Sequence, residues 1–303
     1  MNALPRCLIV LLLALGLAPA LHAADALDRA IAHAEALQTR ALAAVAAAER
    51  AFAQAESDLR VVHGIEADAR RARDPAALHV AGEAVREAQA LERETRRNLD
   101  LARELLNARG RQLHELRGWT RADRRPRALL VAESGEVRHI TPGGYEPPDL
   151  PPLRAGETVR TGPDGRARLF ISGGDAEVAL GANSAYTVTQ DDAQTGFVGQ
   201  LESGLMRLRA LIKNKLGKKF EVRTPSAVTS ARGTDYSVAR TPDGDVVRVH
   251  EGVVAVTPPV GGDEVLLRAG EQLRVPLQGA WPAPQPFNTD DVELPWSADR
   301  ASP

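Results

Sequence analysis

Three segments in the C-terminal half of the chain decide the fold. They are Phe220-Glu221-Val222-Arg223-Thr224-Pro225-Ser226-Ala227-Val228, then Arg232-Gly233-Thr234-Asp235-Tyr236-Ser237-Val238, then Glu251-Gly252-Val253-Val254-Ala255-Val256. Before them come Leu153-Arg154-Ala155-Gly156-Glu157, Thr161-Gly162-Pro163-Asp164-Gly165-Arg166-Ala167-Arg168-Leu169 and Leu180-Gly181-Ala182-Asn183-Ser184. Turn residues recur between the apolar runs at Pro163-Asp164-Gly165, Ser172-Gly173-Gly174-Asp175, Pro242-Asp243-Gly244 and Gly261-Gly262-Asp263. Short strands between regular turns, without a long helix, predict an all-β region. Gly165 and Gly244 suit turn positions with positive φ.

Taken in this order, the six segments resemble the FecR-type periplasmic domain, over roughly residues 135–275. The resemblance implies an all-β module, β-solenoid-like or a layered sandwich, that senses or binds without enzymatic activity. The family-motif residues are Thr161, Gly162, Gly165, Thr224, Pro225, Arg232, Gly233, Thr234, Glu251 and Gly252. Two roles stay open for Arg232, which either holds backbone carbonyls or an acidic neighbour, or contacts a partner directly.

The N-terminal segment, residues 1–23, has the pattern of a cleaved signal peptide. One basic residue, Arg6, precedes an apolar run from Leu8 to Leu17, and small residues follow at Ala20 and Ala23. The run is shorter than the roughly 20 residues that a spanning helix needs. We therefore expect export to the periplasm and a mature chain without a membrane span. The single cysteine, Cys7, lies inside the signal, so the mature chain has no disulfide or thiol chemistry.

Residues 24–117 have the apolar periodicity of two long helices. In the first helix the apolar face consists of Ile31, Ala34, Gln38, Ala41, Val45, Ala48, Phe52, Ala55, Leu59 and Val62. In the second it consists of Leu78, Ala81, Val85, Ala88, Leu99, Ala102, Leu106, Leu113 and Leu116. Asp74-Pro75 is an N-cap followed by a first-turn proline, and Gly118 is expected to end the second helix.

Because the connection is short, the two helices predict an antiparallel hairpin of the coiled-coil type. The alanine-rich seam is thin, so two alternatives stay open: a self-sufficient spacer, or a hairpin that pairs with a second copy or another helical protein.

The overall prediction is α+β in separate domains. A linker at 118–134 precedes the FecR-like domain at 135–277, and a proline-rich tail at 278–303 is expected to dock through Trp281, Phe287 and Trp296.

Charge is concentrated in one short stretch. The chain of 303 residues has a formal net charge of -2, which gives no overall bias toward nucleic acid. All four lysines lie between residues 213 and 219, with Arg223 close by and Arg232 further along. The candidate binding residues are Lys213, Lys215, Lys218, Lys219, Arg223 and Arg232. This cluster is either a solvated loop or a patch that attracts an acidic protein or an anionic envelope polymer.

The sequence contains no pattern that indicates catalysis, a metal or a cofactor. The seven histidines are scattered without metal-ligand spacing, and nucleophile-elbow, phosphate-loop and dinucleotide motifs are missing from the sequence. We therefore predict a non-enzymatic periplasmic protein for sensing, binding or scaffolding. The alternative is a periplasmic adaptor of a transport or secretion system, because such adaptors also join a helical hairpin to β domains.

The domain organisation of this chain differs from that of the membrane-spanning regulators that contain FecR-type domains. Those regulators have a cytoplasmic head that binds a sigma factor, followed by an internal transmembrane helix. Here a predicted signal peptide and a helical hairpin stand in that place. The resemblance therefore implies a sensor-type module, and the anti-sigma activity is not expected to carry over.

Overall fold

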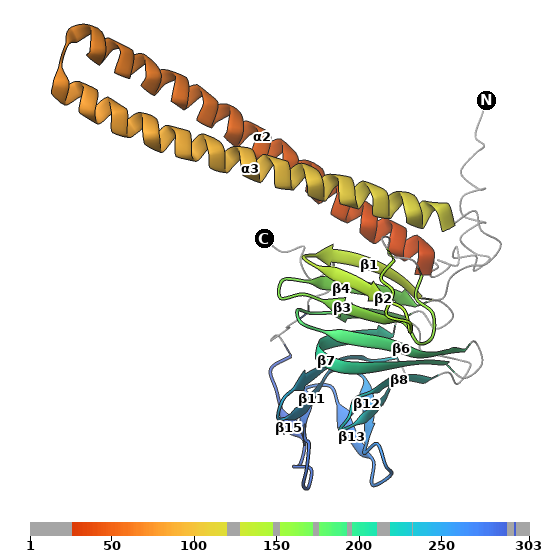
Figure 1. The fold of residues 1–303 in the computed structure, drawn as a ribbon. Helices are drawn as coiled ribbons and strands as arrows, with labels where there is room; N and C mark the ends of the chain where they lie inside the picture. The colour runs from red at the N-terminus through yellow and green to blue at the C-terminus, as the bar shows by residue number, and fades with distance from the viewer. Residues whose placement is uncertain are drawn as a thin grey trace, which may run out of the picture.

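The computed structural model describes residues 26–119, 128–147, 152–171, 176–192, 196–210, 219–231, 233–289 and 294. The helices α2 (Ala26–Ala72) and α3 (Pro75–Trp119) form a long antiparallel hairpin, which leans with its base on a β region (Figure 1). The prediction of α+β in separate parts is therefore confirmed. The predicted signal peptide lies outside the described residues. Among those described, no helix has a stretch long and apolar enough to cross a membrane.

Only two residues connect the helices. Arg73 adopts a φ of 56°, which ends α2. The side chain of Asp74 then accepts hydrogen bonds from the backbone N–H groups of Ala76 (3.0 Å) and Ala77 (3.1 Å), so it caps α3 as predicted. At the other end α3 runs to Trp119, so Gly118 lies in its last turn and does not end the helix.

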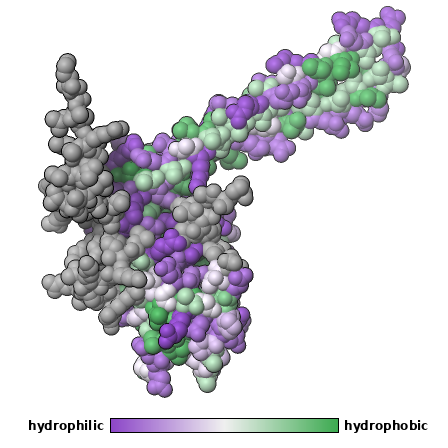
Figure 2. Space-filling view, turned by 180° about the vertical axis from the view of Figure 1, so that it is seen from behind, coloured by the Kyte–Doolittle hydropathy of each residue, from purple (hydrophilic) through white to green (hydrophobic). Residues whose placement is uncertain are grey.

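The seam between the helices follows the predicted positions. Ala41, Ala55 and Leu99 are buried, and Phe52 and Leu106 are half-buried. Ion pairs join the helices across the surface, from Arg103 to Glu49 and from Arg117 to Glu35, and the guanidinium of Arg96 lies 5.3 Å from the centre of the Phe52 ring. The outer surface of the hairpin is mixed, with apolar side chains exposed among the charged ones (Figure 2).

The β region is a curled mixed sheet folded into two layers. One layer has the order β1 (Ala128–Ser134), β4 (Arg166–Ile171), β5 (Ala176–Leu180), β7 (Gly196–Ala210), β10 (Asp235–Thr241), β11 (Gly244–Glu251), β14 (Glu271–Pro276) and β15 (Gln285–Pro286). The other has the order β2 (Val137–Ile140), β3 (Thr158–Thr161), β6 (Ala185–Asp192), β7, β8 (Lys219–Arg223), β9 (Val228–Ala231), β12 (Val253–Thr257) and β13 (Val265–Arg268). Side chains from both layers form one continuous core.

The strand β7 holds the two layers together because it belongs to both. Its first half pairs with β6 and β8, and its second half pairs with β5 and β10. The change occurs at Gly204, where φ is 85° and a Cβ would lie 2.3 Å from the hydroxyl of Ser184. Glycine is therefore required at the point where the chain passes from one layer to the other.

A local unit is used twice in the β region. The sequence Leu-Arg-Ala-Gly-Glu occurs at residues 153–157 and again at residues 267–271. In each copy the glutamate side chain accepts a 2.7 Å hydrogen bond from a backbone N–H, from Arg154 to Glu157 and from Arg268 to Glu271. The first copy leads into β3 in one layer, and the second leads into β14 in the other.

The boundaries of the β region differ from the prediction at its N-terminal side. Residues 118–134 were expected to be a linker, but β1 occupies the last seven of them. At the C-terminal side, Trp281 packs against the core and the ring of Phe287 meets that of His250 edge-on at 5.4 Å. Leu294 is buried against the sheet. The tail therefore docks through two of the predicted aromatics, and Trp296 lies outside the described residues.

The half-buried ring of Phe52 provides a test of the hairpin seam. Phe52→Asp should lower the unfolding free energy of the helical part by about 2 kcal/mol, because it removes apolar contacts and places a charge in the seam. Thermal unfolding followed by circular dichroism at the helical minimum, together with sedimentation, measures the effect. The matched control is Ala53→Asp, which adds the same charge at an exposed neighbouring position. Equal melting of the two variants would contradict the seam.

Candidate binding site

The base of the hairpin packs on the outward face of β1 and β4. An apolar cluster joins the first turns of α2, the last turns of α3 and the two strands, with Ala26, Leu27, Ala30, Ala34, Leu113, Leu116, Leu129, Val131 and Phe170 as its buried members. Every residue of β4 from Ala167 to Ile171 is buried, so the strand is covered on both faces. The hairpin and the β region are therefore joined by a packed interface.

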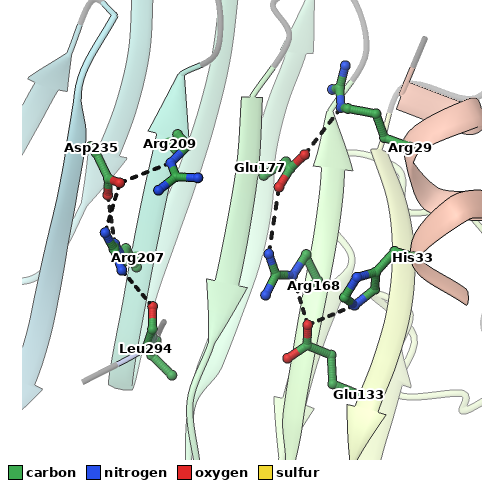
Figure 3. Close-up of polar contacts among 9 residues, drawn as sticks. All are labelled: Arg29, His33, Glu133, Arg168, Glu177, Arg207, Arg209, Asp235 and Leu294. Atoms are coloured by element: carbon green, nitrogen blue, oxygen red, sulfur yellow. Dashed lines mark hydrogen bonds and ion pairs between the residues drawn. The ribbon is translucent and has the colours of Figure 1, made fainter. Parts of the chain in front are cut away.

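A network of charged side chains lies within this junction, on the right of Figure 3. The Glu133 carboxylate at the end of β1 accepts a 2.8 Å hydrogen bond from Nε of Arg168 on β4, and it lies 2.8 Å from Nε2 of His33 on α2. On the other side of Arg168 stands Glu177 of β5, at 3.7 Å. Arg29 of α2 lies 3.3 Å from the same Glu177. Two residues of the helix and three of the sheet thus form a continuous chain of polar contacts.

Glu133 is held ionised by these partners. Burial of its side chain acts to raise its pKa, but the hydrogen bond to His33 and the positive charge and hydrogen bond of Arg168 outweigh burial and lower the pKa from 4.5 to about 2. Arg109 on α3 adds a second clamp, because its guanidinium donates to the backbone carbonyls of Ala132 and Glu133. Its pKa is lowered by burial. Both helices therefore bind the end of β1, α2 through His33 and α3 through Arg109.

A cleft of about 350 Å³ opens beside this network, between the hairpin and the sheet. Its lining comes from both helices and from β1 and β4, and consists of His33, Leu37, Arg40, Ala41, Ala44, Leu105, Arg109, Glu133, Ser134, Arg166 and Arg168. A volume of this size lies within the range of small-molecule sites in proteins. The cleft is the candidate binding site.

A second buried network ties β7, β10 and the tail together, on the left of Figure 3. Arg207 donates to both oxygens of Asp235, at 2.7 and 2.9 Å, and to the backbone carbonyl of Leu294 at 2.9 Å. Arg209 donates to Asp235 at 3.0 Å. Two arginines thus neutralise one buried carboxylate. The network fixes the docked tail. Its charged groups bind one another and a backbone carbonyl, which is typical of a structural role.

The family-motif residues have structural positions in the described part of the chain. The hydroxyl of Thr161 donates to the carbonyl of Gly181, and Thr224 uses its hydroxyl to cap the turn at Ser226 and to donate to Asp245. Gly162 and Gly165 lie in the turn after β3, Pro225 follows β8, and Gly233 and Thr234 precede β10. Glu251 is the last residue of β11, and Gly252 lies between β11 and β12.

Gly165 is required for a reason other than the predicted one. Its φ is not positive, but a Cβ there would lie 2.3 Å from the carbonyl oxygen of Glu136, so the turn needs the space that glycine leaves. The prediction of positive φ is wrong at Gly165 and confirmed at Gly244, where φ is 142°.

The structure does not gather the predicted basic cluster into a described site. Lys213, Lys215, Lys218 and Arg232 lie outside the described residues, and only the backbone of Lys219 is described, at the start of β8. At the end of that strand, Arg223 is exposed and pairs with Glu221 at 2.6 Å. The described residues contain no group of three His, Cys, Asp or Glu side chains that could hold a metal ion.

The residues of the cleft and its network were not identified from the sequence. One signal pointed to them. Ala128-Leu129-Leu130-Val131 and Leu169-Phe170-Ile171 are continuous apolar runs and lack the alternation of a strand with one solvated face. Such runs indicate a second covering layer, and the hairpin has long apolar faces that can form it.

The shifted pKa of Glu133 predicts an acid-dependent loss of stability. A carboxylate with a folded-state pKa of about 2, against 4.5 as its ordinary value, stabilises the fold above pH 4.5, and this stabilisation is lost as pH falls through about 2. Between these limits the unfolding free energy should fall by about 3 kcal/mol more in the parent than in Glu133→Gln. Urea unfolding at several pH values measures the difference.

Glu136→Gln is the control for this experiment, since that side chain is 61% exposed three residues further along the chain. It should follow the parent at every pH. Parallel pH profiles of the parent and Glu133→Gln would show that Glu133 does not carry the stabilisation assigned to it.

Comparison with known proteins agrees with the resemblance. The family model described as FecR protein matches residues 157–255. No curated protein matches the chain. Two crystal structures of a proposed anti-sigma factor from Parabacteroides distasonis are similar at 20% identity and a TM-score of 0.39; each match covers 44% of this chain and 61% of that chain. Residues 157–255 of the β region therefore match the FecR family model.

Proposed function

We propose that this protein is a non-enzymatic envelope protein in which the FecR domain senses or binds a partner and the hairpin serves as an arm fixed to it. The FecR domain itself suggests a regulatory or sensing role. The observation that carries the proposal is the packed, charge-lined junction, because it joins the domain to the hairpin as one unit and leaves an open cleft beside the joint.

The chemistry of the buried acids supports a binding role. A general acid or base must reach the substrate with a free carboxylate. In the described structure Glu133 is bound by Arg168, Asp235 by Arg207 and Arg209, and Asp245 by Arg240 at 2.8 Å. These carboxylates act as structural partners of arginines.

The partner that we propose is a protein or an anionic polymer of the cell envelope. The signal-peptide pattern of the sequence supports a periplasmic location, with a mature chain that would begin near Leu21 or Ala24. The thin seam of the hairpin also supports association with a second copy of the chain, since each buried methylene contributes only about 0.8 kcal/mol.

Crosslinking in intact cells tests the role of the FecR side. A photoreactive residue replaces Val253 of β12, Leu266 of β13 or Val260 in the segment between these strands, which are exposed at 43%, 54% and 96%. Strands β12 and β13 lie at the end of the β region away from the hairpin (Figure 1). Discrete adducts are expected from this set in protein that is recovered from the periplasm without its first 20 residues. Leu42 and Val61 on the hairpin are the comparison positions. Adducts from the hairpin alone, or an intact Met1, would contradict the proposal.

The lysine cluster is tested by its dependence on salt. If Lys213, Lys215, Lys218 and Lys219 attract an anionic polymer, replacing all four by Gln should lower the salt concentration that elutes the protein from dextran sulfate, because attraction between exposed charges is screened by salt. The control variant removes the same charge from the exposed hairpin positions Arg50, Arg60, Arg93 and Arg97. If the eluting salt concentration falls equally for the two variants, the lysine cluster contributes no more to binding than other surface charges do.

A further inference from the structure

The cleft between hairpin and sheet carries more positive than negative charge. Four arginines line it, against one glutamate. Arg168 and Arg109 are engaged, the first with Glu133 and Glu177, and the second with backbone carbonyls of β1. Arg40 on α2 and Arg166 on β4 have no acidic partner among the described residues. The positive charge of these two guanidinium groups is therefore available to a ligand.

Part of the lining is apolar. Leu37, Ala41 and Ala44 follow one another along α2, and Leu105 of α3 stands beside them. Leu105 is 43% exposed, so its apolar side chain is accessible to a ligand in the cleft. A ligand that covers it gains the free energy of removing apolar area from water, in addition to any ionic contact.

The walls of the cleft are held in place before any ligand binds. His33 and Arg168 border the cleft and are also members of the chain of polar contacts that fixes α2 on β4, and Arg109 anchors α3 to β1. A site whose walls are already ordered loses less conformational entropy when it binds. The junction therefore has the properties of a preformed receptor.

We propose that this cleft binds a small amphiphilic anion, whose carboxylate or phosphate group pairs with Arg40 and Arg166 while its apolar part covers Leu105 and the alanine face of α2. The planar fork of arginine suits both kinds of oxyanion. The proposal rests on the proposed function and adds to it a small ligand at the joint between arm and domain, distinct from the protein or polymer that the FecR side binds.

The test is calorimetric titration of the full mature chain with hexyl phosphate, hexanoate, hexan-1-ol and inorganic phosphate. Hexyl phosphate and hexanoate should bind, hexan-1-ol should fail, and inorganic phosphate should bind at least tenfold more weakly than hexyl phosphate. This last difference separates an amphiphile from a free inorganic anion. Binding of inorganic phosphate as tight as that of hexyl phosphate would overturn the apolar half of the proposal.

Variants locate the binding in the cleft. Arg40→Gln and Arg166→Gln should each weaken hexyl phosphate by about tenfold, the loss expected for one hydrogen bond to a charged group. Leu105→Ala should weaken hexyl phosphate and leave inorganic phosphate unchanged. The matched control is Arg50→Gln, an exposed arginine ten residues further along α2 that does not line the cleft. The helical circular dichroism of each variant should equal that of the parent.

The outcomes separate this proposal from the proposed function. If hexyl phosphate does not bind at millimolar concentration, or binds equally well to Arg40→Gln, Arg166→Gln and the parent, the ligand class assigned to the cleft is wrong. Crosslinked adducts from the FecR side in the same preparation would then leave the sensing role in place. Binding in the cleft without any such adduct would contradict the proposed role of the FecR domain and leave the ligand assignment standing.

Discussion

The burial of the Glu133 carboxylate at the end of β1 is the constraint on which the junction depends. Removing an ionised carboxylate from water costs several kcal/mol unless charged partners and hydrogen bonds replace the water. Here the partners come from different elements, His33 from α2 and Arg168 from β4. The end of β1 is therefore stable in its buried form only when helix and sheet are both in place. The apolar cluster around Phe170 adds the area that makes the assembly favourable.

In the β region, the two layers are held together by a strand that they share. The long strand β7 belongs to both, so neither layer can form its full set of pairings without the other. The repeated Leu-Arg-Ala-Gly-Glu segment adds the same turn before a strand of each layer. The cleft depends on this arrangement indirectly, because the second half of β7 supports β5, and β5 in turn pairs with β4, whose residues Arg166 and Arg168 line the cleft.

Local patterns in the sequence predicted the elements well. The Asp74-Pro75 pair placed the turn of the hairpin, and the apolar periodicity placed Leu99 and Ala55 in its seam, because both features act within a few residues of the chain. The docking of hairpin on sheet was missed, since it brings together residues such as His33 and Glu133 that are 100 positions apart. Charged residues in a helical pattern are ordinarily assigned to the solvated face, and nothing local distinguishes His33 or Arg29 from their exposed neighbours. The doubled Leu-Arg-Ala-Gly-Glu segment and the unbroken apolar run at Leu169 were visible signals of the second layer and of the covering helices.

The two kinds of contact at the junction have different consequences for the arm. Burial of apolar area supplies free energy but has no preferred direction, so the patch around Phe170 and Leu116 would allow the hairpin to rotate or slide on the sheet. The hydrogen bonds from Arg168 to Glu133 and from Arg109 to main-chain carbonyls form only at short range and over a narrow range of angles. They therefore fix the direction of a hairpin whose helices, at 1.5 Å per residue, extend over roughly 70 Å. A change of a few degrees at the base displaces the far end by several ångströms. A ligand that binds among these same side chains is thus placed where a small local shift has the largest effect on the arm.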